Sequence, residues 1–182
     1  AYGDAQDVLH REHAYALPAD QQWRHWAGNV SVPRALHEQI GGYDPDYRQY
    51  GWEDIDYGYR LYAAGYPVVI RPELETRHHA AAVTTHSKAV RALHGTAARN
   101  LFVGKHGAAP LGTIGAPRGA WGAAVRLVAL STTEATLTRS SALIDAVADY
   151  LPRGLARRLI ALQVEGAAEA GRAHPHRAQR AI

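Results

Sequence analysis

The chain has 182 residues, 47% of them hydrophobic, and contains no cysteine. This length suffices for one domain with a buried core, and the composition excludes a disordered tail. The net charge of +3 comes mostly from scattered basic residues without a recognisable nucleic-acid-binding module, so we expect no DNA or RNA partner. We also expect no signal peptide or membrane span, because the most apolar stretch, residues 121–130, is short and contains Arg126.

The first 40 residues predict a loop, a strand and a helix. Residues 1–25 are polar and rich in histidine, which predicts a variable loop segment, and residues 26–31 predict a β-strand. A short helix after Pro33 is expected to end at Gly41-Gly42, because glycine accepts the positive φ of a helix end. Asn29 and Ser31 have two equally good interpretations: they line the floor of a ligand site, or they satisfy the strand end and cap the helix.

Carboxylates and aromatic residues are concentrated between residues 41 and 70. Helical spacing predicts a helix from Glu53 to Gly65, with Glu53 and Asp54 on its first turn, where the helix dipole already favours negative charge. Asp56 fits a structural role, an ordinary surface pair with Arg60 worth roughly 0.3–0.5 kcal/mol. The two earlier carboxylates stand beside Trp52 and three tyrosines, which suits the recognition of sugar rings and hydroxyls.

Two histidines follow the next predicted strand, residues 67–70. In an extended backbone neighbouring side chains point to opposite faces, so His78 and His79 are not expected to face the same site. A chain that contains eleven histidines also places two together by chance. A longer helix is predicted from Thr84 or Ser87 to about Lys105, with one apolar face.

The last third of the chain is predicted to be helical. A Gly/Pro-containing linker, 107–119, precedes three expected helices over 120–170 and a flexible basic tail, 171–182. Leucines 151, 155, 159 and 162 form an apolar stripe with arginines towards the other side. We favour packing of this stripe on the catalytic region or a second subunit, and the alternative is that the helix lies on an anionic bilayer.

Residues 26–79 resemble the C-terminal half of nucleotide-sugar glycosyltransferases with the GT-A fold. The likeness is to the inverting family 2 enzymes and to the galactosyltransferase C-terminal region. The shared pattern is Asn-x-Ser, a short helix, Gly-Gly-aromatic-Asp, Gly-x-Glu-Asp, a helix ending in Arg-Leu and Gly, and a strand leading to a His. The resemblance implies an α/β fold, with the acceptor and base region at 26–106, the acceptor-side loop at 1–25 and a helical extension after the linker.

The resemblance also implies roles for single residues. Asp54 would be the general base that takes the proton from an acceptor hydroxyl, and Glu53 would hold the acceptor. His78, with His79 as the alternative, would complete a Mn²⁺ or Mg²⁺ site. Further substrate contacts are expected from Asn29, Gly42, Asp44, Tyr50, Gly51 and Trp52. Adjacent carboxylates do not offer the opposed pair of a glycosidase, so transfer is favoured over hydrolysis.

In such enzymes a nucleotide-binding half of roughly 100 residues precedes the acceptor half and carries an Asp-x-Asp pair after a strand. Only 25 residues precede Trp26, and Asp44-Pro45-Asp46 and Asp54-Ile55-Asp56 match the pattern without a leading apolar strand. We therefore expect the donor-binding half elsewhere in the same enzyme or on a partner chain.

The prediction is an inverting, metal-dependent bacterial transferase of polysaccharide biosynthesis. It would use a nucleotide-diphospho-sugar donor and a saccharide or lipid-linked acceptor, in the cytoplasm or at the inner face of the membrane. The alternative is a non-catalytic saccharide-binding or scaffolding fragment.

Overall fold

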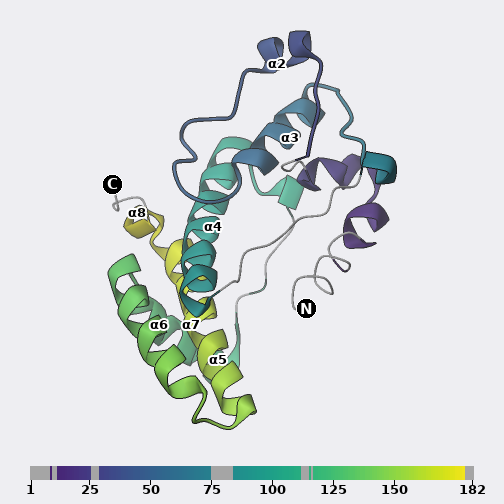
Figure 1. Ribbon diagram of the computed structural model, residues 1–182. Helices are drawn as coiled ribbons and strands as arrows, with labels where there is room; N and C mark the ends of the chain where they lie inside the picture. The colour runs from purple at the N-terminus through teal and green to yellow at the C-terminus, as the bar shows by residue number, and fades with distance from the viewer. Residues whose placement is uncertain are drawn as a thin grey trace. The chain divides into compact units, whose positions relative to one another are not determined.

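The computed structural model describes residues 9, 12–25, 29–74, 84–111, 115 and 117–178. Every regular element within these ranges is helical (Figure 1). The elements are η1 (Ala19–His25), α2 (Arg34–Ile40), α3 (Glu53–Ala63), η2 (Pro72–Leu74), α4 (Thr85–His106), η3 (Ala109–Leu111), α5 (Gly119–Ser131), α6 (Glu134–Ala148), α7 (Arg153–Ala173) and α8 (Pro175–Ala178). In the described part of the chain, no helix is both long enough and apolar enough to cross a membrane.

The α/β fold class predicted from the sequence is wrong, because the described chain forms no strand and no sheet. Strands were expected at residues 26–31 and 67–70, and the described residues of both segments, 29–31 and 67–70, form no ladder with a neighbour. Side chains from distant parts of the sequence form hydrogen bonds there instead: Gln22 Oε1 accepts from the Ile70 amide at 3.0 Å, and Asn29 Nδ2 donates to the Leu74 carbonyl at 2.7 Å. An apolar run forms a β-strand only when a neighbouring strand supplies hydrogen-bond partners for its backbone.

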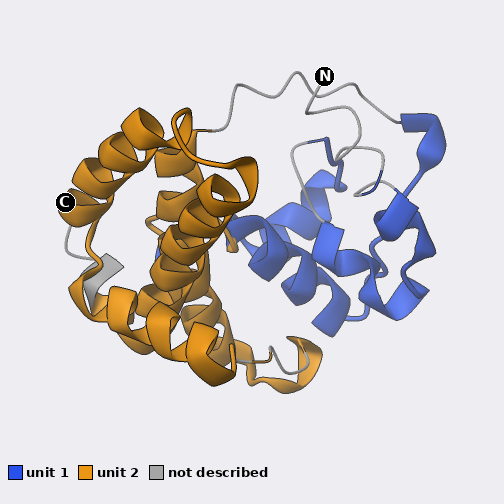
Figure 2. Cartoon of the chain, turned by 90° about the horizontal axis from the view of Figure 1, so that it is seen from below, with its two compact units in different colours: residues 1–46, 53–82 blue, residues 47–52, 83–182 orange. Residues whose placement is uncertain are grey.

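The chain divides into two compact units (Figure 2). Unit 1 comprises residues 1–46 and 53–82, and unit 2 comprises residues 47–52 and 83–182. The short segment 47–52 therefore belongs to unit 2 although both of its neighbours along the chain belong to unit 1.

Unit 1 is organised around α3. Tyr57 and Leu61 are buried, and partly buried apolar residues of α2 and of both extended segments pack against them. Trp23 of η1 is 2% exposed and meets the Tyr59 ring at 4.9 Å between centroids. Helix α3 ends at Gly65, whose φ of +87° is the left-handed conformation that glycine adopts without strain.

A buried ion pair joins α3 to the end of α2. Asp56 has no exposed surface, and its Oδ2 accepts from Arg60 Nε at 2.8 Å. The guanidinium also donates to the carbonyls of Ile40 at 3.0 Å and Gly42 at 2.7 Å. The sequence-based interpretation of an ordinary surface pair is therefore wrong, because the acid lies in the core and its partner also fixes two loop carbonyls.

Unit 2 is a helical bundle centred on α4. Thr84 caps the helix, its Oγ1 accepting from the Ser87 amide at 3.1 Å, and the cap and length confirm the predicted helix. The core consists mainly of small side chains from four helices: Ala89, Leu93, Ala97, Ala129, Leu137, Ala167 and Ala170. Helices α5, α6 and α7 confirm the three helices expected between residues 120 and 170.

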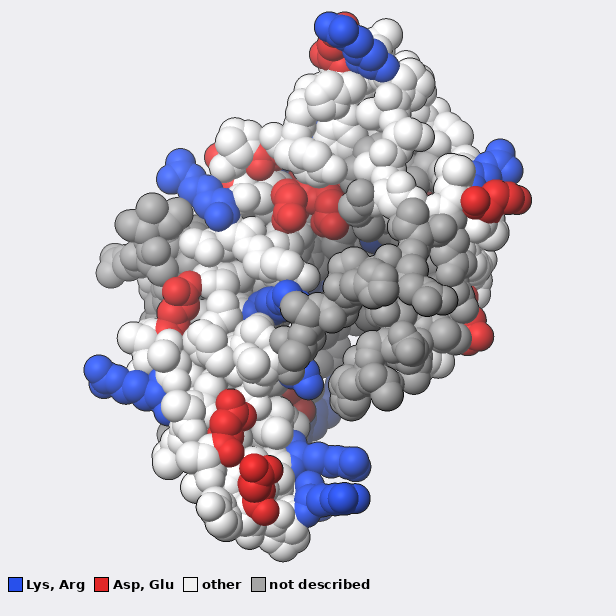
Figure 3. Space-filling view, viewed as in Figure 1, with Lys and Arg blue, Asp and Glu red and all other residues white. Residues whose placement is uncertain are grey.

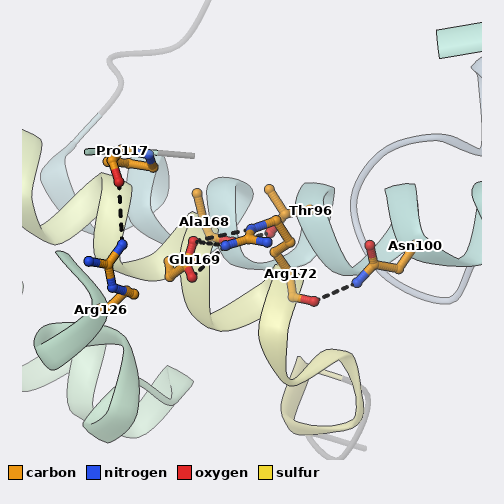
Figure 4. Close-up of polar contacts among 7 residues, drawn as sticks. All are labelled: Thr96, Asn100, Pro117, Arg126, Ala168, Glu169 and Arg172. Carbon is orange, nitrogen blue, oxygen red and sulfur yellow. Dashed lines mark hydrogen bonds and ion pairs between the residues drawn. The ribbon is translucent and has the colours of Figure 1, made fainter. Parts of the chain in front are cut away.

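Small residues bring α7 very close to α4. A Cβ on Gly171 would overlap the Leu93 carbonyl oxygen and Thr96 Oγ1. Thr96 Oγ1 donates to the Ala168 carbonyl at 2.8 Å, and Asn100 Nδ2 donates to the Arg172 carbonyl at 2.8 Å (Figure 4). The two helices are thus joined by polar contacts that only a close approach of their backbones permits.

Candidate functional site

The two carboxylates singled out in the sequence occupy the first turn of α3, as predicted. Asp54 is partly buried, and its Oδ1 accepts from the Ile55 amide at 2.8 Å. Within the described chain this is the one hydrogen bond of the Asp54 side chain, so its other oxygen is available to a ligand. Both carboxylates lie beside the unpaired first-turn amides and the positive end of the helix dipole, where negative groups are accommodated.

Glu53 differs from Asp54 in the hydrogen bonding of its carboxylate. Its Oε2 is buried and has no hydrogen-bond partner among the described residues. A buried acceptor left unpaired costs about 1–3 kcal/mol, so most such atoms in folded proteins have a partner. Glu53 Oε2 is therefore an acceptor that a hydroxyl donor would satisfy.

The two residues before the carboxylates have unusual backbone conformations. Gly51 has a φ of +95° and Trp52 a φ of +76°. Positive φ is strained for a bulky side chain, costs of order 1–3 kcal/mol, and is found preferentially at functional sites. Within unit 2 the Trp52 ring packs on Phe102, with centroids 5.4 Å apart, and this contact helps to hold the strained residue.

Other aromatic residues of segment 47–52 contact cations of α4 within unit 2. Tyr50 is 59% exposed, and the Arg91 guanidinium lies 4.9 Å from its ring centroid. Tyr47 is buried, with Lys105 Nζ 5.7 Å from its ring. The sequence predicted the aromatic character of this segment but not its attachment to α4, because the spacing along the chain suggested continuity with α3.

Two other residues that were predicted to contact substrate, Gly42 and Asp44, form hydrogen bonds within unit 1. Asp44 Oδ1 accepts from the Asp46 amide at 2.9 Å, which closes a turn, and the Gly42 carbonyl accepts from Arg60. Both interactions stabilise the loop after α2. The structure therefore places Asn29, Gly42, Asp44, Glu53 and Asp54 in unit 1 and Tyr50, Gly51 and Trp52 in unit 2.

The predicted metal ligands His78 and His79 lie outside the described residues. Among the residues that the structure does describe, no three His, Cys, Asp or Glu side chains gather closely enough to hold a metal ion. The described part of the chain thus supplies no complete set of protein ligands for Mn²⁺ or Mg²⁺.

Unit 1 contains a cavity of about 330 Å³. Its polar lining comes from Tyr15, His25, Asn29, Ser31, Tyr66 and Arg71, and apolar residues such as Leu36 and Leu61 complete it. Neither Glu53 nor Asp54 lines it, and Leu61, which does, lies eight residues after Glu53, about 12 Å along the helix. The sequence analysis named Asn29 and Ser31 as candidates for the floor of a ligand site. It missed Tyr66 and Arg71, which stand on either side of the apolar run 67–70.

A side-chain hydrogen bond also joins α2 to α3. His37 Nδ1 and the Tyr57 hydroxyl are 2.8 Å apart and share a hydrogen bond. Burial raises the pKa of Tyr57 above its ordinary value of 10.0, the Arg60 charge opposes this shift, and Tyr43 adds to it. Tyr57 therefore stays a neutral phenol throughout the physiological range.

The front part of the chain is similar to glycosyltransferases. Residues 9–86 match a family model described as the N-terminal domain of galactosyltransferase, and this match covers less than half of the chain. The resemblance to glycosyltransferases is thus confirmed. The narrower assignment to the C-terminal half of a GT-A enzyme is not supported, because the matching description names an N-terminal domain.

Two curated relatives share a shorter segment. They are validoxylamine A glucosyltransferases, from Streptomyces hygroscopicus subsp. jinggangensis (strain 5008) and Streptomyces hygroscopicus subsp. limoneus. Each is 46% identical to this chain over 48 residues, which are 26% of this chain and 11% of the relative. The chain thus spans about a tenth of the length of these relatives. No solved structure matches it.

Proposed function

We propose that this chain supplies the acceptor site and the general base for transfer of a sugar from a nucleotide-diphosphate donor to a hydroxyl group. The similarity of residues 9–86 to glycosyltransferases supports sugar transfer in general. Inversion at the anomeric carbon and the division of roles between the carboxylates are the finer parts of the proposal.

The observation that carries the proposal is the unpaired, buried Oε2 of Glu53. Because this oxygen is shielded from solvent, the Glu53 side chain would have to turn towards the acceptor, and a hydroxyl that then donates to it would remove the cost of leaving it unsatisfied. Only an O–H or N–H donor fits, because the carboxylate next to it on the same helical turn excludes a second anion. Glu53 would therefore orient the hydroxyl that reacts.

Asp54 would then take the proton. A general base must be ionised at working pH and must have an oxygen within hydrogen-bond reach of the attacking hydroxyl. Asp54 Oδ1 is oriented by the Ile55 amide, which leaves Oδ2 for the substrate. As the hydroxyl oxygen attacks the anomeric carbon, its proton moves to Asp54 and the nucleoside diphosphate leaves. A single displacement of this kind inverts the anomeric configuration.

Dependence on Mn²⁺ or Mg²⁺ is a further part of the proposal. The described residues do not gather three protein ligands. A divalent ion would therefore depend on the oxygens of the donor diphosphate together with the imidazole of His78, or of His79 as the alternative. Such an ion stabilises negative charge on the leaving diphosphate when bound.

A second candidate function is favoured by the cavity in unit 1. It has the size of a small-ligand site and combines aromatic, hydroxyl, amide and guanidinium groups without the two carboxylates. A saccharide could bind there without being processed. The chain would then be a saccharide-binding or scaffolding fragment.

The two functions are separated by measuring turnover and binding together. Release of nucleoside diphosphate is followed in the complete enzyme, with its donor-binding half present, using uridine, guanosine and thymidine diphosphate sugars and a panel of hydroxyl acceptors, with Mn²⁺ or with a chelator. We expect Asp54→Asn to lower turnover by at least about 100-fold while calorimetric binding of the diphosphate stays intact. Asp145→Asn, on the exposed face of α6, is the matched control.

Undiminished turnover in Asp54→Asn rejects Asp54 as the base. If no donor is turned over or bound while a saccharide still binds, and Arg71→Gln abolishes that binding, the second candidate holds instead.

A further inference from the structure

Helix α7 is buried along only one half of its length. All of its fully buried residues lie between Gln163 and Gly171, where it packs on α4. The preceding ten residues, 153–162, include none. The first half of α7 therefore presents much of its surface to solvent, and the turn before it carries Tyr150, which is 88% exposed.

An open hollow of about 470 Å³ lies where this half of α7 meets α5. Its lining consists of Trp121 from α5 and Arg157, Arg158 and Ala161 from α7. Trp121 is 37% exposed, and its indole Nε1 donates to Glu165 Oε2 at 2.8 Å. That hydrogen bond fixes the indole ring at the edge of the hollow. It also occupies the carboxylate of Glu165, which lies four residues after Ala161 on α7.

The charge of this segment is predominantly positive. Between residues 149 and 162 the sequence has three arginines and one carboxylate, Asp149. Neither Arg157 nor Arg158 forms an ion pair with any described residue, whereas the arginine at the other end of α7, Arg172, pairs with Glu169 (Figure 4). In Figure 3 basic side chains project side by side from the lower end of the bundle, with acidic groups to one side of them.

Apolar groups stand next to these cations. Leu155 is 46% exposed and lies three residues before Arg158, so the two side chains are neighbours on the helix surface. We name the set Trp121, Tyr150, Leu155, Arg157 and Arg158 the tip surface. It combines exposed apolar and aromatic groups with cations that lack partners.

We propose that the tip surface binds an anionic phospholipid bilayer. Guanidinium groups pair with lipid phosphates, and Trp, Tyr and Leu side chains enter the boundary between headgroups and acyl chains. A two-fold contact with a second copy would face unpaired arginines against the same arginines, which is repulsive. The negative charge of lipid phosphates is complementary to these arginines, whereas the same surface of a second copy is not. This proposal is independent of the proposed sugar transfer.

The test is sedimentation of the full chain with vesicles of phosphatidylcholine, with and without phosphatidylglycerol. We expect binding only when phosphatidylglycerol is present, and weaker binding as salt is raised. Arg157→Gln/Arg158→Gln should lower the partition coefficient roughly 30-fold, from about five-fold for each arginine. Arg34→Gln/Arg48→Gln removes the same charge from two exposed residues elsewhere and should change binding much less.

Leu155→Ser tests the apolar part and should weaken binding several-fold at any salt concentration. All variants concern exposed residues, and circular dichroism checks that they fold. The proposal is overturned if the native chain ignores phosphatidylglycerol, or if the two double variants lose binding equally. It is also overturned if the native chain self-associates without lipid and Arg157→Gln/Arg158→Gln does not, because the surface then serves a second copy.

Discussion

The two units reach stability by different means. Unit 2 has a core of alanines with a few larger aliphatic residues, and its helices approach until backbone atoms touch. Unit 1 buries aromatic rings and one ion pair, and it retains a cavity and an unpaired carboxylate oxygen. Small side chains let the helices of unit 2 approach closely, whereas the larger groups of unit 1 leave a cavity of about 330 Å³. The cavity of unit 1 is lined by residues of the part of the chain that is similar to glycosyltransferases.

The largest effect is expected from filling the closest contact of unit 2. Gly171→Ala would force a methyl group into the Leu93 carbonyl and should cost about 3 kcal/mol or more, at the upper end of overpacking. Gly166→Ala meets the movable Val128 side chain at 2.6 Å and should cost less, about 1–3 kcal/mol. Gly154→Ala is the control, because nothing lies within 4 Å of its position and helix propensity predicts a gain of about 0.5–1 kcal/mol. Denaturant unfolding gives the ranking, and equal costs for all three would disprove the close approach.

A similar loss is expected in unit 1 from breaking its buried ion pair. Asp56→Ala removes the buried partner of Arg60, whose own side chain is 24% exposed, and should cost about 3 kcal/mol, at the lower end for breaking a buried pair. Glu38→Ala breaks a pair of the same i,i+4 spacing, but there both side chains are mostly exposed, so it should cost at most about 1 kcal/mol. Thermal unfolding of both variants measures the contrast. Equal melting temperatures would show that burial of Asp56 contributes nothing.

The smallest effect concerns the Tyr57 hydroxyl. Tyr57→Phe removes the hydrogen bond with His37 and should cost about 1 kcal/mol at neutral pH. Because the folded state raises the pKa of Tyr57, its contribution is complete below the ordinary value of 10.0 and is lost as the pH rises through the folded pKa. The native chain should therefore lose more stability than Tyr57→Phe above pH 10. Parallel stability curves for the two proteins would contradict the raised pKa.

Local signals predicted the helices that follow Pro33, whereas the predicted loop 1–25 is wrong at η1, residues 19–25. The cap at Thr84, the glycines after α2 and α3, and the carboxylates at the start of α3 each act within a few residues, and the structure contains each helix. The expected strands depended on a partner elsewhere in the chain, which no local pattern can supply. Their apolar runs are instead extended segments beside the cavity of unit 1.

The candidate site was predicted in part. Residue types and spacing placed Glu53 and Asp54 on one helical turn, as found. Burial could not be read from spacing, so Asp56 was expected at the surface and the unpaired oxygen of Glu53 was not foreseen. The attachment of segment 47–52 to α4 also depends on tertiary contacts, such as that of Trp52 with Phe102.

The absence of a side chain at Gly171 has a consequence for how the bundle opens. With backbone against backbone and Thr96 bonded across to Ala168, no water can enter between α4 and α7 while the two helices remain together. Separating them must disrupt the shared core in one step. The bundle should therefore unfold as a single cooperative block rather than fray turn by turn.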